Sequence, residues 1–258
     1  MTEGTVRFEE RGRVGHVTFD RPSARNALTW AMYAELADIC RRIAAERKVG
    51  VVVFRGAGGK AFVAGTDIAH FVDFASGEDG IRYEAEMDAF LATLEALPMP
   101  TIAVVEGFAV GGGLAIATAC DFRIATPDAR FGVPIARTLG NCLSAKGYAR
   151  LLAAIGVSHA KRLLILGEMI DATEAKAAGY VHAIAEPGAI GAAADALCAR
   201  LLENAPITME ASKEALRRVV AANLPDIEGL VRRVYGSEDF RRGVRAFLDK
   251  KPPEWTGR

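Results

Sequence analysis

Four glycines between positions 107 and 113 form the segment best suited to stabilise a negative charge. Gly107 is followed by Gly111, Gly112 and Gly113, and the small apolar residues 114–119 continue the chain as a helix would. A glycine turn at a helix N-terminus lets a ligand oxygen approach the peptide N–H groups, and the helix dipole favours developing negative charge there. On this segment alone, an anion-stabilising turn and a turn that only allows close packing are equally good interpretations.

A second glycine-rich loop, at residues 56–61, reads GAGGKA after the apolar run 51–54. It formally matches the dinucleotide fingerprint G-x-G-x-x-A, which has to open a helix. Residues 61–64, followed by Gly65, have an extended pattern instead, and Lys60 is not followed by the Ser or Thr of a phosphate-binding P-loop. The sequence therefore predicts a plain turn here.

Several ordered motifs occur along nearly the whole chain. They are RPSARNAL at 21–28, AFVAGTDI at 61–68, VEGFAVGGGLAIATACDFRIA at 105–125, ARFGVP at 129–134, ATEAKAAGYV at 172–181 and the tail 239–251. Together they resemble the enoyl-CoA hydratase/isomerase (crotonase) superfamily. The resemblance implies an α/β crotonase-like (ClpP/crotonase) fold, with a spiral core of stacked ββα units and a helical C-terminal trimerisation region. It also implies an acyl-CoA thioester as partner, with coenzyme A as part of the substrate and no covalently bound cofactor.

The same resemblance implies roles for individual residues. By motif position, the peptide N–H groups of Thr66 and Gly112 would polarise the thioester carbonyl as it becomes an enolate-like oxyanion. Arg25 would pair with a phosphate, and Phe247 and Lys250 would reach the nucleotide, often from a neighbouring subunit. For Arg25 and Lys250, a solvated surface charge is a strong alternative. The further residues expected to contact the substrate are Ala64, Gly65, Asp67, Ile68, Gly111, Ile135 and Arg137.

Two positions depart from the pattern of the resembled family. A typical hydratase of that family places one glutamate two residues after the third glycine and another just after FG-x-P, to handle the water and the α-proton. These positions are Ala115 and Ile135 here, and neither side chain can transfer a proton. We therefore do not expect the two-glutamate hydration.

Other side chains are candidates to replace the glutamates. Arg137 could hold a substrate carboxylate, Thr138 or Asn141 could hydrogen-bond the acyl group, and His70 could donate a proton. Each also has an ordinary structural interpretation: His70 as a partly exposed helix residue and Asp67 as a cap or salt-bridge partner. A titratable group in a cleft does not by itself identify the chemistry.

Three functions stay open at this point. The leading one is an enzyme of enoyl-CoA hydratase/isomerase type, a lyase or isomerase of fatty acid metabolism that stabilises a thioester enolate. The alternatives are an acyl-CoA decarboxylase, for which Arg137 would hold the carboxylate, and a non-catalytic acyl-CoA-binding homologue.

The elements that position these residues follow from hydrophobic periodicity. We expect a core at 1–200 and a helical oligomerisation region at 201–258. We also expect a homotrimer or a dimer of trimers, because the oligomerisation region contains apolar residues that it could not bury alone: Val219, Val220, Leu230, Val231 and Val234. Thr29 is the predicted N-cap of the first helix. The expected strands are 5–9, 15–19, 51–54, 101–105 and 122–125, and the expected helices are 29–44, 83–97, 144–167, 188–204, 206–222 and 237–250.

Composition and charge exclude several classes of protein. The 258 residues are 51% hydrophobic, and 32 basic residues balance 32 acidic ones, so no long-range field attracts nucleic acid. The four cysteines and four histidines are scattered, which predicts no metal site. The uncharged run 107–120 is shorter than the about 20 residues of a membrane span. Because residues 1–12 contain no apolar signal segment, we expect a cytoplasmic protein without membrane contact.

Overall fold

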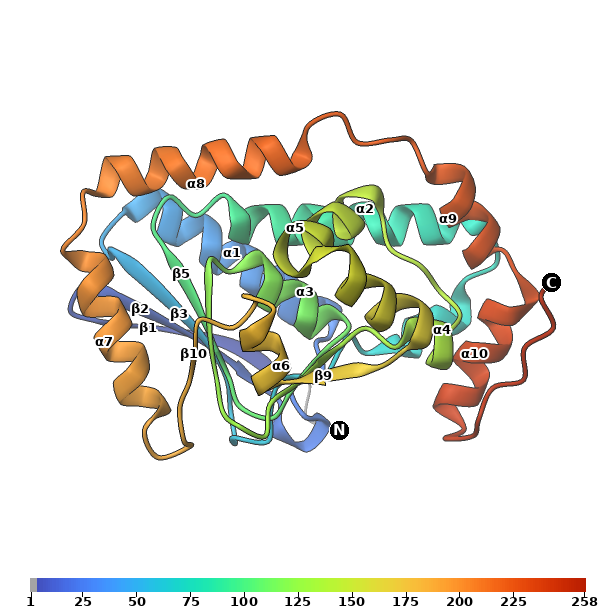
Figure 1. The fold of residues 1–258 in the computed structure, drawn as a ribbon. Helices are drawn as coiled ribbons and strands as arrows, with labels where there is room; N and C mark the ends of the chain where they lie inside the picture. The colour runs from blue at the N-terminus through green and yellow to red at the C-terminus, as the bar shows by residue number, and fades with distance from the viewer. Residues whose placement is uncertain (1–3) are drawn as a thin grey trace.

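Two β-sheets form the centre of the protein (Figure 1). The computed structural model describes residues 4–258, apart from the side chain of His70. The six-stranded sheet has the order β1-β2-β3-β5-β7-β10 and is parallel except for the β1/β2 hairpin. The four-stranded sheet has the order β4-β6-β8-β9, with β8 and β9 antiparallel. The strands of the two sheets are β1 (Thr5–Arg11), β2 (Val14–Asp20), β3 (Val51–Gly56), β4 (Ala61–Val63), β5 (Thr101–Val105), β6 (Phe108–Val110), β7 (Phe122–Ala125), β8 (Arg130–Gly132), β9 (Met169–Asp171) and β10 (Ala183–Ile184).

From β3 to β8, successive strands alternate between the two sheets, and helices separate the pairs. β3 and β4, β5 and β6, and β7 and β8 each place one strand in each sheet, which confirms the expected stacked ββα units of a crotonase-like fold. The α-helices are α1 (Trp30–Glu46), α2 (Gly77–Glu95), α3 (Gly112–Ala119), α4 (Ile135–Thr138), α5 (Ala145–Lys161), α6 (Ala172–Ala177), α7 (Ile190–Leu202), α8 (Pro206–Ala221), α9 (Glu228–Tyr235) and α10 (Glu238–Leu248). Shorter helical turns are η1 (Pro22–Ala24), η2 (Ile68–Asp73) and η3 (Arg162–Leu166).

Most expected elements are present, and the differences have local causes. Thr29 caps α1, accepting a hydrogen bond from the Met32 N–H at 3.2 Å. α2 begins at Gly77 rather than at 83, because Ser76 and Asp79 form a capping box ahead of the apolar stripe. The expected helix 144–167 is interrupted at Gly156, where φ is 74°, and ends as a π-helix. α6 and α9 were not expected from periodicity.

The C-terminal helices contact different parts of the molecule. α7 packs on the six-stranded sheet, whereas α9 and α10 join the main hydrophobic core beside α2 through Val231, Tyr235 and Phe240 (Figure 1). Val231 is therefore already buried within the single chain and gives no support for the expected oligomer. α8 follows one edge of the molecule and leaves Ile207 and Val219 80% and 72% exposed. Within residues 4–258, no helix combines the length and apolar character needed to cross a membrane.

Candidate active site

The segment after β4 places the peptide group of Thr66 at one wall of a cavity. Leu28 forms a parallel bridge with Thr66, in which the Leu28 N–H donates to the Gly65 carbonyl at 2.9 Å and the Asp67 N–H donates to the Leu28 carbonyl at 2.8 Å. Because this pairing uses the peptide groups on either side, it leaves the Thr66 N–H facing away from Leu28. Gly65 has a φ of 111°, which the turn before Thr66 requires.

Gly112 brings a second peptide N–H to the same wall. It is the first residue of α3, so its N–H has no acceptor within the helix, and Gly111 before it has a φ of 55°. A Cβ on Gly112 would overlap the Tyr33 hydroxyl and lie 2.8 Å from Thr66 Oγ1. A Cβ on Gly113 would overlap the Val63 carbonyl oxygen. The glycines are therefore needed for the close approach of α3 to Thr66, which supports the packing interpretation of this turn. The anion-site interpretation stays a prediction.

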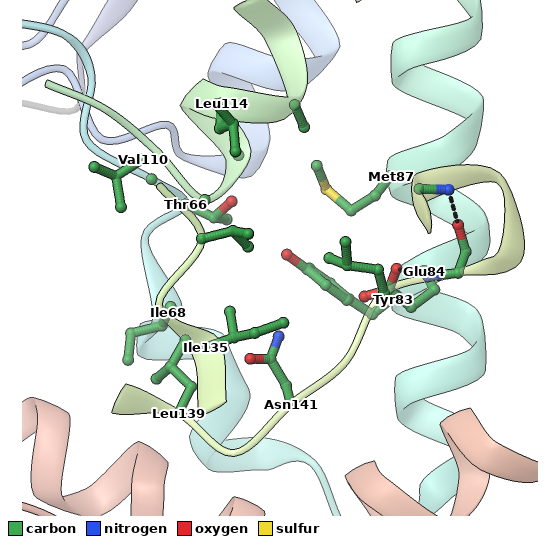
Figure 2. A pocket seen from close by; sticks show the side chains of 18 of the residues that line it. Thr66, Ile68, Tyr83, Glu84, Met87, Val110, Leu114, Ile135, Leu139 and Asn141 are labelled. Atoms are coloured by element: carbon green, nitrogen blue, oxygen red, sulfur yellow. Dashed lines mark hydrogen bonds between the residues drawn. The ribbon is translucent and has the colours of Figure 1, made fainter. Parts of the chain in front are cut away.

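Two tyrosine hydroxyls lie beside Thr66. Tyr33 Oη and Thr66 Oγ1 are 2.9 Å apart. Tyr83 extends from α2 with its hydroxyl pointing into the cavity toward Thr66 (Figure 2). Burial raises the pKa of Tyr33 and of Tyr83 above the ordinary range of tyrosine, so both hydroxyls stay protonated at neutral pH.

The cavity beside Thr66 and Gly112 is mainly apolar near these N–H groups and polar at its far end. Its walls come from η2, α2, α3, α4, the segment 141–144, α5 and α10 (Figure 2). An apolar cavity next to convergent donors suits an acyl chain attached to a carbonyl group. The apolar wall includes Ile68, Phe71, Met87, Leu91, Leu114 and Leu139, and the polar end includes Glu84, Asp88, Asn141, Ser144 and Arg150.

Glu84 is a buried carboxyl group in this polar end, only 8% exposed. Its Oε1 accepts a hydrogen bond from the Tyr235 hydroxyl at 2.6 Å, and its Oε2 accepts one from the Ser144 N–H at 2.8 Å. Burial raises the pKa of Glu84 to about 7, although both hydrogen bonds act in the opposite direction. A carboxyl group with this pKa exchanges a proton near neutral pH.

Asn141 continues the hydrogen-bonded chain. Its Nδ2 donates to the Tyr235 hydroxyl at 3.2 Å, while its Oδ1 is buried without a hydrogen-bond partner among the described residues. Thr138, also predicted as a site residue, lines the cavity and donates from its hydroxyl to the Pro134 carbonyl at 2.9 Å. Both residues therefore lie where an acyl group can contact them.

Most of the residues expected at the site do line the cavity. Ala115 and Ile135 also lie in its wall. That they replace the two glutamates of the resembled hydratases stays a prediction. The cavity-lining residues from the sequence-based set are Ala64, Gly65, Thr66, Ile68, Gly111, Gly112, Ile135, Thr138, Asn141 and Phe247.

Four expected residues lie outside the cavity wall. Arg25 is exposed. Its carbonyl accepts a hydrogen bond from the Ala64 N–H at 3.1 Å, and its guanidinium lies 5.5 Å from the Phe108 ring centroid. Asp67 caps η2 and forms an ion pair with Arg21 at 3.0 Å, as its structural interpretation predicted. Arg137 and Lys250 are exposed, and the geometry does not bring Arg137 to the acyl group. The side chain of His70 lies outside the described part of the chain.

Glu84, Tyr83 and Tyr235 were missed by sequence reasoning, although one signal for Glu84 was present. Glu84 is three residues before Met87 and seven before Leu91, so it falls on the apolar stripe of α2, where a solvated acid does not belong. Tyr235 had no such signal, because α9 itself was not expected.

Comparison with known proteins agrees with this geometry. A model of the enoyl-CoA hydratase/isomerase family matches residues 9–258. The short-chain-enoyl-CoA hydratase of Clostridium acetobutylicum is 33% identical, with 98% of each chain covered. An enoyl-CoA hydratase/carnithine racemase from Magnetospirillum magneticum is 32% identical with a TM-score of 0.79, covering 98% of this chain and 96% of that one. A methylmalonyl-CoA decarboxylase complexed with 2S-carboxypropyl-CoA is 25% identical with a TM-score of 0.88, with 98% of both chains covered. The chain therefore belongs to the enoyl-CoA hydratase/isomerase family.

Proposed function

We propose that the protein is an acyl-CoA thioester enzyme that stabilises a thioester enolate between the peptide N–H groups of Thr66 and Gly112. The observation that carries the proposal is the convergence of these two groups at the wall of an apolar cavity. Preorganised donors of this kind stabilise the charge that develops on a carbonyl oxygen, and each contributes about 2.7 to 4 kcal/mol. Hydration or isomerisation of an enoyl-CoA is the reaction class that this arrangement supports best.

The coenzyme A part of the substrate would lie on the outer side of the Thr66 loop. Ala64, Gly65 and Ile68 offer main-chain contacts there, and the Arg25 carbonyl accepts a hydrogen bond from the Ala64 N–H while its side chain is exposed. The relative from Clostridium acetobutylicum, named a short-chain-enoyl-CoA hydratase, supports the choice of a CoA thioester.

Decarboxylation of a CoA ester is the second candidate. The high TM-score to a methylmalonyl-CoA decarboxylase bound to a carboxypropyl-CoA favours it. The expected carboxylate partner Arg137 is outside the cavity wall. Arg150 does line the cavity, but its guanidinium already donates two hydrogen bonds to the Glu95 carboxylate, at 2.6 and 3.1 Å. The geometry therefore ranks this reaction below enoyl-CoA chemistry.

Polarisation of a bound thioester tests the oxyanion hole. A cinnamoyl-type CoA ester should show a red-shifted absorbance on binding, and removal of the Gly112 N–H should abolish the shift. Because any side chain on Gly112 overlaps the Tyr33 hydroxyl, the test uses Gly112→Pro in a Tyr33→Phe background. Proline is tolerated at the first helical position; it removes the N–H and adds the ring carbons. Gly112→Ala in the same background is the matched control, because it adds a Cβ and keeps the donor.

A panel of thioesters separates the reaction classes. The enzyme should convert 2-enoyl- or 3-enoyl-CoA esters and leave malonyl- and methylmalonyl-CoA unchanged. Release of carbon dioxide from methylmalonyl-CoA would favour the second candidate. Binding of all esters with turnover of none would indicate the non-catalytic homologue, and no saturable binding at millimolar concentration would overturn the proposed function.

A further inference from the structure

Glu84 is a buried acid without a cationic partner among the described residues. It is 8% exposed on the apolar stripe of α2, where an apolar side chain would avoid the cost of burying a carboxylate. Its two oxygens accept hydrogen bonds from the Tyr235 hydroxyl and the Ser144 N–H, and no ion pair connects it to a basic side chain in residues 4–258. A ligand in the cavity is the partner that remains for this acid.

One continuous cavity connects Glu84 with the proposed oxyanion hole. Thr66 and Gly112 line this cavity, and so does Glu84. Figure 2 shows Thr66 and Glu84 on opposite sides of it, with Met87 and Tyr83 between them. An acyl group whose carbonyl oxygen lies at Thr66 and Gly112 therefore presents its far end, rather than the carbon next to the carbonyl, to Glu84.

The unused hydrogen-bonding capacity of this polar end belongs mainly to acceptors. Each oxygen of Glu84 accepts one hydrogen bond from the protein, and a carboxylate oxygen can accept a second. The single proton of the Tyr235 hydroxyl goes to Glu84, so Asn141 donates to Tyr235 from Nδ2 and keeps its Oδ1 as an acceptor without a partner among the described residues. The guanidinium of Arg150 already donates to Glu95. A hydrogen-bond donor on the ligand is the group that this end of the cavity can satisfy.

The groups around Glu84 come from four elements. On its own helix, Asp88 lies one turn further along the chain, and its carboxylate is 3.8 Å from Arg150 Nη1 of α5. Burial also raises the pKa of Asp88. The other titratable or charged groups facing Glu84 are Tyr83 of α2, Tyr235 of α9, Cys142 of the segment before α5, and Tyr148 of α5.

We propose that the acyl group of the substrate ends in a hydroxyl group, which donates a hydrogen bond to the Glu84 carboxylate. This inference rests on the proposed function, because it requires a thioester carbonyl at Thr66 and Gly112. It names the substrate class as CoA thioesters of hydroxylated acyl chains, and it makes Glu84 a residue that determines specificity.

A hydroxyl group fits this end of the cavity better than a charged group does. An ammonium group would lose its own hydration on entering the cavity, and attraction to a buried carboxylate does not repay that cost dependably. A carboxylate on the acyl group would be repelled by Glu84. A hydroxyl group costs less to desolvate, and it adds a third neutral donor to the two that Glu84 already has.

Pairs of esters with equal chain length test this recognition. Each pair exchanges a terminal hydroxyl for a methyl group, as in 5-hydroxypentanoyl-CoA and hexanoyl-CoA, and shorter and longer pairs locate the length that spans the cavity. At that length and pH 8, calorimetric titration should show the hydroxy ester binding about 10- to 150-fold more tightly than its methyl counterpart, the usual range for a hydrogen bond to a charged group. Because the esters are saturated, the measurement does not depend on turnover.

Glu84→Leu should reverse the preference, because the hydroxyl group then has no acceptor and the methyl group meets an apolar side chain. Glu86→Leu is the matched control, since it makes the same change two residues later on the exposed side of α2 and should keep the wild-type preference. Glu84→Gln retains the shape of the side chain and an uncharged acceptor, so it should keep only part of the preference. This variant tests the inference if Glu84→Leu does not fold.

The pH dependence provides a readout that a merely structural role would not move. Burial raises the pKa of Glu84 to about 7, and the hydroxyl group binds the carboxylate form. The preference for the hydroxy ester should therefore increase between pH 6 and pH 8, and binding of this ester near pH 7 should release protons. In Glu84→Gln the preference should not change with pH. Comparing the two esters cancels the titration of Asp88, which both esters share.

The outcomes separate the two proposals. If the hydroxy ester is favoured at no chain length, or if its preference survives Glu84→Leu, the inference is overturned, and the oxyanion hole stands because both esters still bind. A wild type that binds neither ester at millimolar concentration overturns the proposed function itself.

Discussion

Tyr33 Oη and Thr66 Oγ1 lie 2.9 Å apart, beside the space that a side chain on Gly112 would fill. The hydroxyl pair thus closes one side of the proposed oxyanion hole and limits residue 112 to glycine.

Gly112→Ala should destabilise the protein by about 1 to 3 kcal/mol, the usual cost of overpacking a well-filled site. Tyr33→Phe removes one of the two atoms that the new Cβ meets, so it should recover part of this loss. Urea denaturation of the two single variants and the double variant gives the coupling between the positions. Additive changes in the free energy of unfolding would mean that the tyrosine does not restrict the glycine.

The pKa of Glu84 predicts a pH-dependent contribution to stability. Its folded pKa of about 7 is above its ordinary value of 4.5, so the folded state binds the proton more tightly than the unfolded state. This contribution is fully present below pH 4.5 and is lost as the pH rises through 7, a loss of roughly 3 kcal/mol at about 1.4 kcal/mol per pKa unit.

Glu84→Gln should remove that dependence. The difference in unfolding free energy between wild type and Glu84→Gln should therefore change in favour of the variant between pH 5 and pH 8. Taking the difference cancels the groups that both proteins share. A constant difference across this range would show that Glu84 titrates with an unshifted pKa.

Arg25→Gln should weaken the binding of acyl-CoA by about fivefold, corresponding to about 1 kcal/mol for one exposed charge pair. Glutamine keeps a polar side chain at this exposed position but cannot attract a phosphate by charge. The KM for an acyl-pantetheine, which carries no nucleotide, should be unaffected. Equal losses with both substrates would assign Arg25 a structural role, as its contact with the Phe108 ring allows.

Crotonyl-CoA hydration should be slow in the wild type, because Ala115 and Ile135 supply neither acid nor base at the cavity wall. Ala115→Glu should raise the hydration rate at least about tenfold, since a well-placed general acid or base contributes about 10² to 10⁴. Ala115→Gln has a similar volume and no proton to transfer, so it serves as the control. Wild-type hydration at the speed of a two-glutamate enzyme would contradict the expectation.

The exposed apolar residues of α8 predict that the chain forms a homotrimer or a dimer of trimers. Leu216 and Val219 are 67% and 72% exposed in the single chain, and such surfaces are normally covered by a partner. Val219→Glu should shift the mass measured by light scattering toward the 27.5 kDa of one chain. Ala196→Glu, on the exposed side of α7, should leave the assembly unchanged. A wild type that is already monomeric at micromolar concentration would contradict the prediction.

The sequence predicted elements and motifs better than contacts between distant segments. The β1/β2 hairpin, the strand Val51–Gly56 and the Thr29 cap depend on neighbouring residues, whose periodicity and caps are visible in the sequence. The family resemblance assigned Thr66 and Gly112 by their positions in two motifs, and both residues line the cavity. The bond between Glu84 and Tyr235 joins positions 151 apart in the chain, and no local pattern encodes such a pair. Arg137 was misplaced for the same reason: its position in α4 turns it to the surface.

The last elements of the chain complete the cavity, which has a consequence for synthesis. Thr66 and Gly112 leave the ribosome long before Tyr235 of α9 and Phe247 of α10. A nascent or truncated chain ending after α8 therefore contains both peptide donors but lacks the hydroxyl that holds Glu84 and one wall residue of the cavity. Such a chain lacks part of the cavity wall, so activity would begin only after α9 and α10 have been synthesised.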